Sequence, residues 1–351
     1  MIGNKPSKKK QIFPISNQLK EYLDQNNITN TLPIQYEDML RYMASIPLYN
    51  KEGVDTHWQT VFYDERESEH LNAALCEIYA LLMTDGDNSV IEHLKIDRVD
   101  FCVFGNTQPF RVRIVNMIND NYDHFYVKKV DASRVYGLEL EELLSPNSLR
   151  YLVDRSTIIE EHIAGIPGDI FISNHLDVEE FDQIRIAKEF IKFNERCFIR
   201  LLGDMRSYNY IVDITPDIEA VQYRIRSIDF DQQSYEGRKN FYLPQYFKEN
   251  NAIIDLGIKH LSTETVRQYQ LEERSLIARR IQINQTRLNL LMKSLIEDPL
   301  SQEGKITQLA NEMAMHHKNA TFASCQTMGD IIYKNINLLL QKEFVNAYFD
   351  I

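Results

Sequence analysis

An acid, an amide and a second acid follow one another at a spacing that suits phosphate chemistry. Asp204 and Asn209 stand in "GDMRSYNYIVD", and Asp229 follows in "SIDFD". Phosphoryl transfer needs a carboxylate that orients or deprotonates the attacking hydroxyl, and oxygen ligands that hold Mg²⁺ on the nucleotide phosphates. An acid and an amide on one loop, with an acid at the return of a hairpin, can provide these groups. The spacing therefore indicates a candidate centre for phosphate chemistry.

The segments around these three residues have the pattern of a helix, a loop and a β-hairpin. Apolar residues recur at three- and four-residue intervals between Phe181 and Leu201, which predicts a helix with one buried face. Two short strands, "YNYIVDI" and "YRIRSIDF", flank the turn "TPDIEA". The helix leads into the loop that holds Asp204, and the hairpin carries Asp229 back to the same end. We expect the three side chains to lie together.

A change of sequence period near residue 97 predicts a sheet upstream of that helix. "RVDFCVFGN", "FRVRIVNM" and "HFYVKKVD" are short runs of β-branched and aromatic residues, as in an antiparallel meander. A helical stretch, "VYGLELEELLS", and a strand, "STIIEEHI", follow, and "AGIPGD" is a turn or linker. Helical spacing predicts mainly helix over 11–90 and after 250, including 263–297, 302–317 and 327–347.

Length and composition bound the class of protein. A chain of 351 residues is longer than a single hydrophobic core usually accommodates, which favours two lobes. Its content of 44% hydrophobic and 26% charged residues is ordinary for a soluble globular protein. No apolar run approaches the roughly 18 residues of a membrane span. The start, "MIGNKPSKKK", lacks the apolar part of a secretory signal. We therefore expect a cytoplasmic protein with no membrane partner.

Charge and cysteine usage exclude further classes. The net charge of −12 weighs against a nucleic-acid partner, which would need a basic face, but Mg²⁺ can bridge carboxylates to a nucleotide. The four cysteines are scattered among apolar neighbours with no C-x-x-C pair. This pattern favours reduced, buried thiols over a disulfide framework or a zinc site.

Taken together, these motifs resemble the protein-kinase-like superfamily, and more closely its small-molecule branch, the aminoglycoside and choline phosphotransferases. "GDMRSYNYIVD" is similar to that branch's stretch with the catalytic acid, with Asp204 at the base position and Asn209 at the metal position. "SIDFD" is similar to the stretch with the metal-binding acid, at Asp229. The resemblance covers residues 95–260 in order. It implies ATP as the phosphate donor and Mg²⁺ as the metal.

The resemblance also assigns nucleotide contacts upstream of Asp204. Lys128 in "FYVKKV" would hold phosphates, and Glu139 in "GLELEELL" would be its partner. Gly105 lies in the loop between the first two predicted strands. Backbone groups near Glu161 and Ile163, at the end of the last strand, would hold the nucleotide.

Two of these assignments have neighbouring alternatives. Lys128 and Lys129 are adjacent on a strand and point to opposite faces, so only one can enter a cleft, and the pattern aromatic-aromatic-Val-Lys favours Lys128. Glu139, Glu141 and Glu142 form a charge cluster of a kind that usually lies on a solvated helix face. If one of them is functional, we favour Glu139, because it would lie at the border of the helix face that is turned inward. Glu142 is the alternative.

Some features depart from the protein-kinase pattern. The loop "FGNTQPF" has the single glycine Gly105 instead of G-x-G-x-x-G, and 201–203 lack the histidine or arginine that often precedes the catalytic acid. The segment at Asp229 reads D-F-D instead of D-F-G, which favours the small-molecule branch. Asp231 in that segment could add a second metal contact, or serve in a surface or capping role.

We therefore predict an α+β, two-lobed protein-kinase-like fold with helical additions at both ends. Residues 1–90 would form an N-terminal helical extension, 91–166 a small lobe of antiparallel sheet with one helix, and 167–351 a large helical lobe with C-terminal helices. The predicted function is ATP- and Mg²⁺-dependent phosphate transfer to the hydroxyl of an unknown small molecule or protein, with the nucleotide between the lobes.

Three alternatives remain open. A pseudokinase would bind nucleotide or act as a scaffold without turnover, which the poor glycine loop and the missing histidine favour. The same fold could instead transfer AMP to a protein. In a mainly helical interaction protein the motif would be accidental, and ATP with Mg²⁺ would cause no thermal shift.

Overall fold

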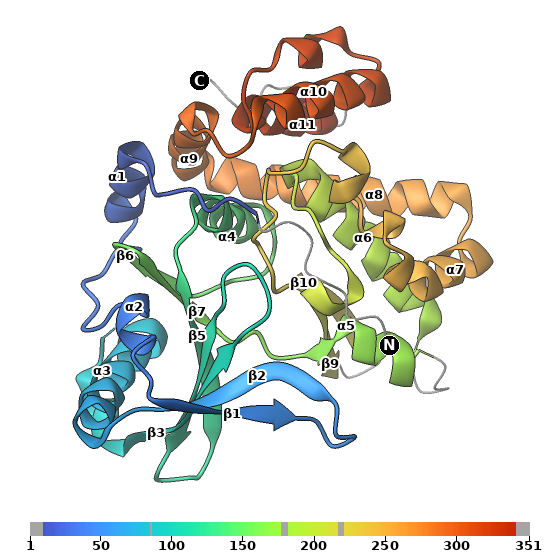
Figure 1. Cartoon of the computed structure of the whole chain (residues 1–351). Helices are drawn as coiled ribbons and strands as arrows, with labels where there is room; N and C mark the ends of the chain where they lie inside the picture. The colour runs from blue at the N-terminus through green and yellow to red at the C-terminus, as the bar shows by residue number, and fades with distance from the viewer. Residues whose placement is uncertain (1–9, 85, 177–181, 217–220, 342–351) are drawn as a thin grey trace. The chain divides into compact units, whose positions relative to one another are not determined.

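The computed structural model describes residues 10–84, 86–176, 182–216 and 221–341 of the chain (Figure 1). Contacts divide the described residues into two compact units. The sheet unit comprises those of 1–131 and 149–162, and the helical unit comprises those of 132–148 and 163–351. The chain is a mixed α+β protein with a large antiparallel sheet and many helices, which is the class that the sequence predicts.

A seven-stranded antiparallel sheet forms the centre of the sheet unit, with the strand order β1-β2-β3-β4-β5-β7-β6. Its strands are β1 (Ala44–Tyr49), β2 (Asp55–Phe62), β3 (Leu94–Cys102), β4 (Phe110–Asn116), β5 (Tyr122–Lys129), β6 (Tyr151–Asp154) and β7 (Thr157–Glu161). The predicted meander is confirmed by β3, β4 and β5, and "STIIEEHI" forms β7 as predicted.

The core of the sheet unit lies between the sheet and one long helix. The helices of this unit are α1 (Asn17–Gln25), α2 (Tyr36–Met39) and α3 (Glu65–Thr84). Leu75 and Ile78 of α3 are buried in one cluster with Val112 of β4 and Phe125 of β5. Side chains of a strand point alternately to its two faces, and here the apolar ones point toward α3. A shift of one residue would turn them to the other face, so burial of this apolar face fixes the register of the strands.

Residues 44–62 differ from the sequence prediction, which placed them in a mainly helical region. They form the hairpin β1–β2, because β2 is rich in Thr, Val and aromatic residues and Val61 enters the core. Turn chemistry closes the hairpin: the Asn50 side chain accepts hydrogen bonds from the backbone of Glu52 and Val54, and Gly53 adopts a φ of 76°. The sheet therefore begins about fifty residues earlier than predicted.

The helical unit combines a small sheet with most of the helices. Its helices are α4 (Ala132–Leu144), α5 (Gly168–Asn174), α6 (Gln183–Arg200), α7 (Asn251–His260), α8 (Thr263–Ile283), α9 (Gln285–Glu297), α10 (Glu303–His317) and α11 (Met328–Gln341). Its strands are β8 (Ile166–Pro167), β9 (Tyr210–Pro216) and β10 (Val221–Ser227), in the order β10-β9-β8. The predicted hairpin is confirmed by β9 and β10, whose antiparallel register pairs Tyr210 with Ser227.

Three further outcomes concern the helices. The predicted helix over 263–297 is divided at Asn284, which ends α8 and precedes α9. The predicted helix over 327–347 is observed as α11, and its part after residue 341 lies outside the described residues. Residues 132–148, predicted within the small lobe, group with the helical unit because α4 packs against α8 and α9.

The central helix of the helical unit is α6, which packs against α7, α8 and β10 (Figure 1). Phe193 of this helix contacts the ring of Tyr210 at a centroid distance of 5.3 Å. Burial of α6 places its C-terminal end next to the hairpin β9–β10. No helix in the part of the chain that the structure describes has both the length and the apolar character needed to cross a bilayer.

Candidate functional site

Two loops of the helical unit meet where α6 ends. Leu201 ends the helix in a left-handed conformation, with a φ of 55°. Gly203 then donates its backbone N–H to Gln232 at 3.2 Å, and Ser234 donates to the backbone oxygen of Leu201 at 3.0 Å. Gly203 is required here, because a Cβ would lie 2.6 Å from the ring of Phe241. The loop that carries Asp204 is thereby tied to the segment that follows Asp229.

Asp204 has an unusual backbone and a half-buried carboxylate. Its φ is 59°, a left-handed conformation that Asp tolerates better than most residues. Its backbone N–H donates to the oxygen of Phe241 at 3.2 Å, and its side chain is 27% exposed. The carboxylate is therefore held by the backbone of its loop and still reaches solvent.

Asn209 closes the same loop. Its side-chain amide nitrogen donates to the backbone oxygen of Asp204 at 2.7 Å. This bond fixes the orientation of the amide, because the reverse orientation would place two oxygens against each other. Within the described residues, no hydrogen bond reaches its Oδ1 atom. The backbone oxygen of Asn209 accepts from the N–H of Ile228 at 3.1 Å, which brings the segment of Asp229 alongside.

Asp229 is bound by an arginine that the sequence analysis did not single out. Nη1 of Arg134, in α4, donates to Asp229 Oδ1 at 3.0 Å and to Asp231 Oδ1 at 2.5 Å. Asp229 Oδ1 also accepts the backbone N–H of Asp231 at 3.0 Å. The side chain of Asp229 is 35% exposed, whereas those of Arg134 and Asp231 are buried.

Arg206 is a second residue that sequence reasoning missed. Its Nε donates to Asp204 Oδ1 at 2.9 Å, and its Nη1 donates to Glu249 at 2.7 Å. Its guanidinium also lies over the ring of Phe247, 4.9 Å from the centroid. The available signal was a basic residue two positions after Asp204, whereas nothing local in the sequence pointed to Glu249.

The electrostatics of Asp204 suit a group that takes up a proton. Burial raises the pKa of the Asp204 carboxyl above its ordinary value, and the negative charges of Asp229 and Glu249 act in the same direction. The hydrogen bond and the charge of Arg206 oppose the rise in pKa. A carboxylate with a raised pKa is a better general base than an ordinary aspartate, because its pKa lies closer to neutral pH.

The oxygen donors of this site are of the kind that Mg²⁺ prefers. Asn209 presents an amide oxygen and Asp229 a carboxylate, and both belong to loops that lie against each other. Among the described residues, no three or more His, Cys, Asp or Glu side chains form a group that could hold a metal ion. Mg²⁺ commonly binds to one or two protein oxygens together with substrate phosphates and waters, so this small donor set fits a metal delivered with a nucleotide.

Lys128 belongs to the sheet unit and Glu139 to the helical unit, and each forms an ion pair with a residue of its own unit. In the sheet unit, Lys128 Nζ binds Glu160 at 2.9 Å and both side chains are buried, whereas Lys129 is exposed. In the helical unit, the fully buried Glu139 is bound by Arg287 through both oxygens, at 2.9 and 2.8 Å. Pairing of Lys128 with Glu139 stays a prediction.

The remaining predicted nucleotide contacts are backbone positions. Gly105 is exposed and adopts a φ of 100°, with open space where a Cβ would be. The N–H of Glu161 donates to the oxygen of Arg150 at 3.0 Å, and Ile163 is half-buried. Their roles in binding a nucleotide stay predictions.

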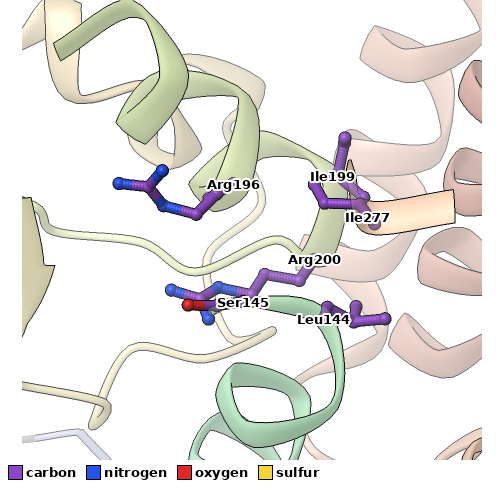
Figure 2. Close-up of a pocket in the computed structure, with 6 residues that line it drawn as sticks. All are labelled: Leu144, Ser145, Arg196, Ile199, Arg200 and Ile277. Atoms are coloured by element: carbon purple, nitrogen blue, oxygen red, sulfur yellow. The ribbon is translucent and has the colours of Figure 1, made fainter. Parts of the chain in front are cut away.

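A narrow pocket of the helical unit is lined by none of the predicted site residues. Figure 2 shows its lining, which comes from α4, α6 and α8 and the residue after α4: Leu144, Ser145, Arg196, Ile199, Arg200 and Ile277. Arg200 forms a buried ion pair with Glu141, which also accepts from Ser145 at 2.7 Å. Burial lowers the pKa of Arg200 to about 9. Because the pocket is too narrow for a water molecule, we interpret it as helix packing.

Comparison with known proteins adds little to this geometry. No family model matches the sequence, and the search of curated proteins found no match. Two solved structures with weak similarity are "Titin kinase and its flanking domains" (13% identity, 69% of this chain, 54% of that chain, TM-score 0.27) and the autoinhibited serine kinase domain of the giant muscle protein titin (13% identity, 73% and 82%, TM-score 0.25). The chain spans about half the length of the first. TM-scores this low carry no argument about fold or function.

Proposed function

We propose that this protein is a phosphotransferase of the kinase-like type that uses ATP and Mg²⁺ and acts on the hydroxyl of a small molecule or protein. The observation that carries the proposal is the bond from the Asn209 side chain to the backbone of Asp204, in a loop tied to the segment of Asp229. The motif resemblance to the aminoglycoside and choline phosphotransferases suggests the same roles for these three residues.

Asp204 orients the acceptor hydroxyl and takes up its proton. Its carboxylate reaches solvent, and burial raises its pKa, which improves a carboxylate as a proton acceptor at neutral pH. Arg206 is a positioning residue, because its bond to Oδ1 fixes the direction of the carboxylate.

Asn209 and Asp229 hold the metal with its nucleotide. Bound Mg²⁺ would neutralise charge on the phosphates as the phosphoryl group is transferred. Asn209 presents its Oδ1 because its amide nitrogen is occupied by the backbone of Asp204. Lys128, Glu139, Gly105, Glu161 and Ile163 are the further nucleotide contacts that the sequence resemblance suggests.

One observation favours a second candidate function, nucleotide binding without turnover. Arg134 already binds one oxygen of Asp229, and a cation at a metal ligand weakens binding of a second cation. If this second function is the true one, the loops of Asp204 and Asp229 bind a nucleotide weakly or without metal, and no phosphate is transferred.

Product analysis separates these functions. The protein is incubated with Mg²⁺ and ATP labelled at either the α- or the γ-phosphate, alone, with a metabolite extract and with a protein extract, and the products are separated. Phosphate transfer gives ADP and a γ-labelled product, and Asp204→Asn removes both. AMP transfer gives an α-labelled product and pyrophosphate. If ATP binds but neither product forms under any condition, the binding function replaces the transferase.

A further inference from the structure

Arg134 reaches the Asp229 segment from inside the helical unit. It lies on α4, its side chain is 1% exposed, and its Nη1 bonds to Asp229 and Asp231 at 3.0 and 2.5 Å. The helix fits this segment closely, because a Cβ on Gly137 would lie 3.0 Å from Cβ of Phe230. The guanidinium is therefore held in place by packing as well as by its two carboxylates.

Two donors bind the same oxygen of Asp229. Oδ1 accepts both the Nη1–H of Arg134 and the backbone N–H of Asp231, each at 3.0 Å. A carboxylate oxygen has two lone-pair sites, so these donors use the capacity of Oδ1. A metal ion that binds through Oδ1 has to displace one of these donors.

Asp231 is excluded from metal binding by the same arginine. Its side chain is 9% exposed, and its Oδ1 makes the shorter of the two bonds from Arg134. Arginine keeps its charge in proteins, so no change of protonation releases Asp231. A divalent cation between Asp229 and Asp231 would have to displace a buried guanidinium.

We propose that Arg134 is a resident cation of this site, which keeps Asp231 from binding a divalent cation and lowers the affinity of Asp229 for one. The inference rests on the proposed function and deepens it, because it states which carboxylate of the acidic segment takes no part in metal binding. The sequence alone left Asp231 open as a second metal contact, and this arrangement assigns Asp231 to Arg134 instead.

The test is Mn²⁺ binding to the full chain, followed by the electron paramagnetic resonance signal of free Mn²⁺. Arg134→Gln removes the positive charge beside Asp229, so Mn²⁺ should bind roughly tenfold tighter or more than to the wild type. Arg134→Gln leaves Asp231 buried without its arginine and risks unfolding. The double variant Arg134→Gln/Asp231→Asn also removes the unpaired negative charge of Asp231. Its affinity should rise less than that of Arg134→Gln, but still above the wild type, because Arg134 bonds directly to Asp229 at 3.0 Å.

A matched control is Arg196→Gln. Arg196 is buried in the same unit and bridges two carboxylates, Glu189 at 2.6 Å and Glu273 at 3.2 Å, but it does not contact Asp229. Its loss should lower the melting temperature and leave Mn²⁺ affinity at the wild-type value. Far-ultraviolet circular dichroism confirms that each variant is folded before titration.

The outcomes separate the inference from the proposed function. Tighter Mn²⁺ binding in either folded Arg134 variant supports the inference, even if the wild type binds no Mn²⁺ at all. If the wild type binds Mn²⁺ and the folded Arg134 variants bind it equally or more weakly, the inference is wrong and the metal role of Asp229 stands. If no variant binds Mn²⁺, with or without ATP, both the metal role of Asp229 and the inference fail.

Discussion

Asn209 donates its side-chain amide hydrogen to the backbone oxygen of Asp204 at a distance of 2.7 Å. The bond spans the loop that carries Asp204 in its left-handed conformation and so stabilises a backbone geometry that is unfavourable by itself. It also couples the two proposed roles, because the residue that would bind the metal fixes the residue that would accept the proton. Changes at Asn209 should therefore affect both roles together, whereas changes at Asp204 and Asp229 should differ.

Amide replacements of Asp204 and Asp229 should fail in different ways. Asp229→Asn removes a charge from the metal site, so it should weaken binding of Mg²⁺–ATP and lower turnover. Asp204→Asn leaves the metal ligands in place, so it should bind Mg²⁺–ATP nearly normally and lose ATP turnover by about 10²–10⁴-fold, as is typical of a lost general base. Calorimetry and a coupled ADP assay measure the two effects. Loss of nucleotide binding in a folded Asp204→Asn variant would show that the roles are assigned wrongly.

The stability effect of Asp204→Asn should depend on pH. Burial raises the pKa of Asp204 above its ordinary value of 3.8, so the folded protein holds this proton more tightly than the unfolded chain. The stabilisation is present below pH 3.8 and is lost as pH rises through the higher folded-state pKa. Because Asn does not ionise, the melting temperature of the variant relative to the wild type should be higher at pH 8 than at pH 4. An equal difference at the two pH values would contradict the effect of burial.

Arg206→Gln should change the pH dependence of turnover. Arg206 lowers the pKa of Asp204 through its hydrogen bond and its charge, so removing it should raise that pKa further. The acidic limb of the profile of ATP turnover against pH should then move to higher pH. Arg185→Gln is the control, because Arg185 is exposed and binds Asp182 at the start of α6. An acidic limb that stays in place in Arg206→Gln would exclude Asp204 as the titrating group.

The two adjacent lysines of β5 should respond differently to replacement. Lys128→Met leaves the buried Glu160 without its lysine and should lower the free energy of unfolding by about 3–5 kcal/mol. Lys129 is exposed, so Lys129→Met should change it by less than about 0.5 kcal/mol. Urea unfolding measures both values.

The same pair tests the phosphate role of Lys128. The double variant Lys128→Met/Glu160→Gln removes both buried charges and should recover most of the lost stability. It should still bind Mg²⁺–ATP more weakly than Lys129→Met if Lys128 holds phosphate. Equal nucleotide affinity in the two variants would remove Lys128 from the site.

Local patterns predicted the elements around the site. The runs of β-branched and aromatic residues that became β3, β4 and β5 are a local property of each strand, and the helical spacing that became α6 comes from its one buried face. The hairpin β9–β10 follows from two short strands on either side of a turn. These features depend on neighbours in the sequence, and so the positions of Asp204, Asn209 and Asp229 in loops and at strand ends could be predicted.

Contacts between distant residues could not be predicted. Arg134 and Asp229 are separated by 95 positions, and no local pattern distinguishes Arg134 from an exposed arginine. The glutamates of α4 show the same limit: such a charge cluster usually lies on a solvated face, yet Glu139 and Glu141 are buried against Arg287 and Arg200. Buried charges need partners, and those partners come from other elements of the fold.

The dependence of ATP binding on Mg²⁺ tests the central claim most directly. ATP is titrated into the full chain by calorimetry with Mg²⁺ and then with EDTA, for the wild type and for Asp229→Asn. An acidic site repels a triphosphate unless a divalent cation lies between them, so the wild type should bind ATP only with Mg²⁺. In Asp229→Asn, the affinity for ATP should be nearly the same with Mg²⁺ as with EDTA. Equal affinity of the wild type with and without Mg²⁺ would contradict the metal role of Asn209 and Asp229, and with it the proposed phosphotransferase.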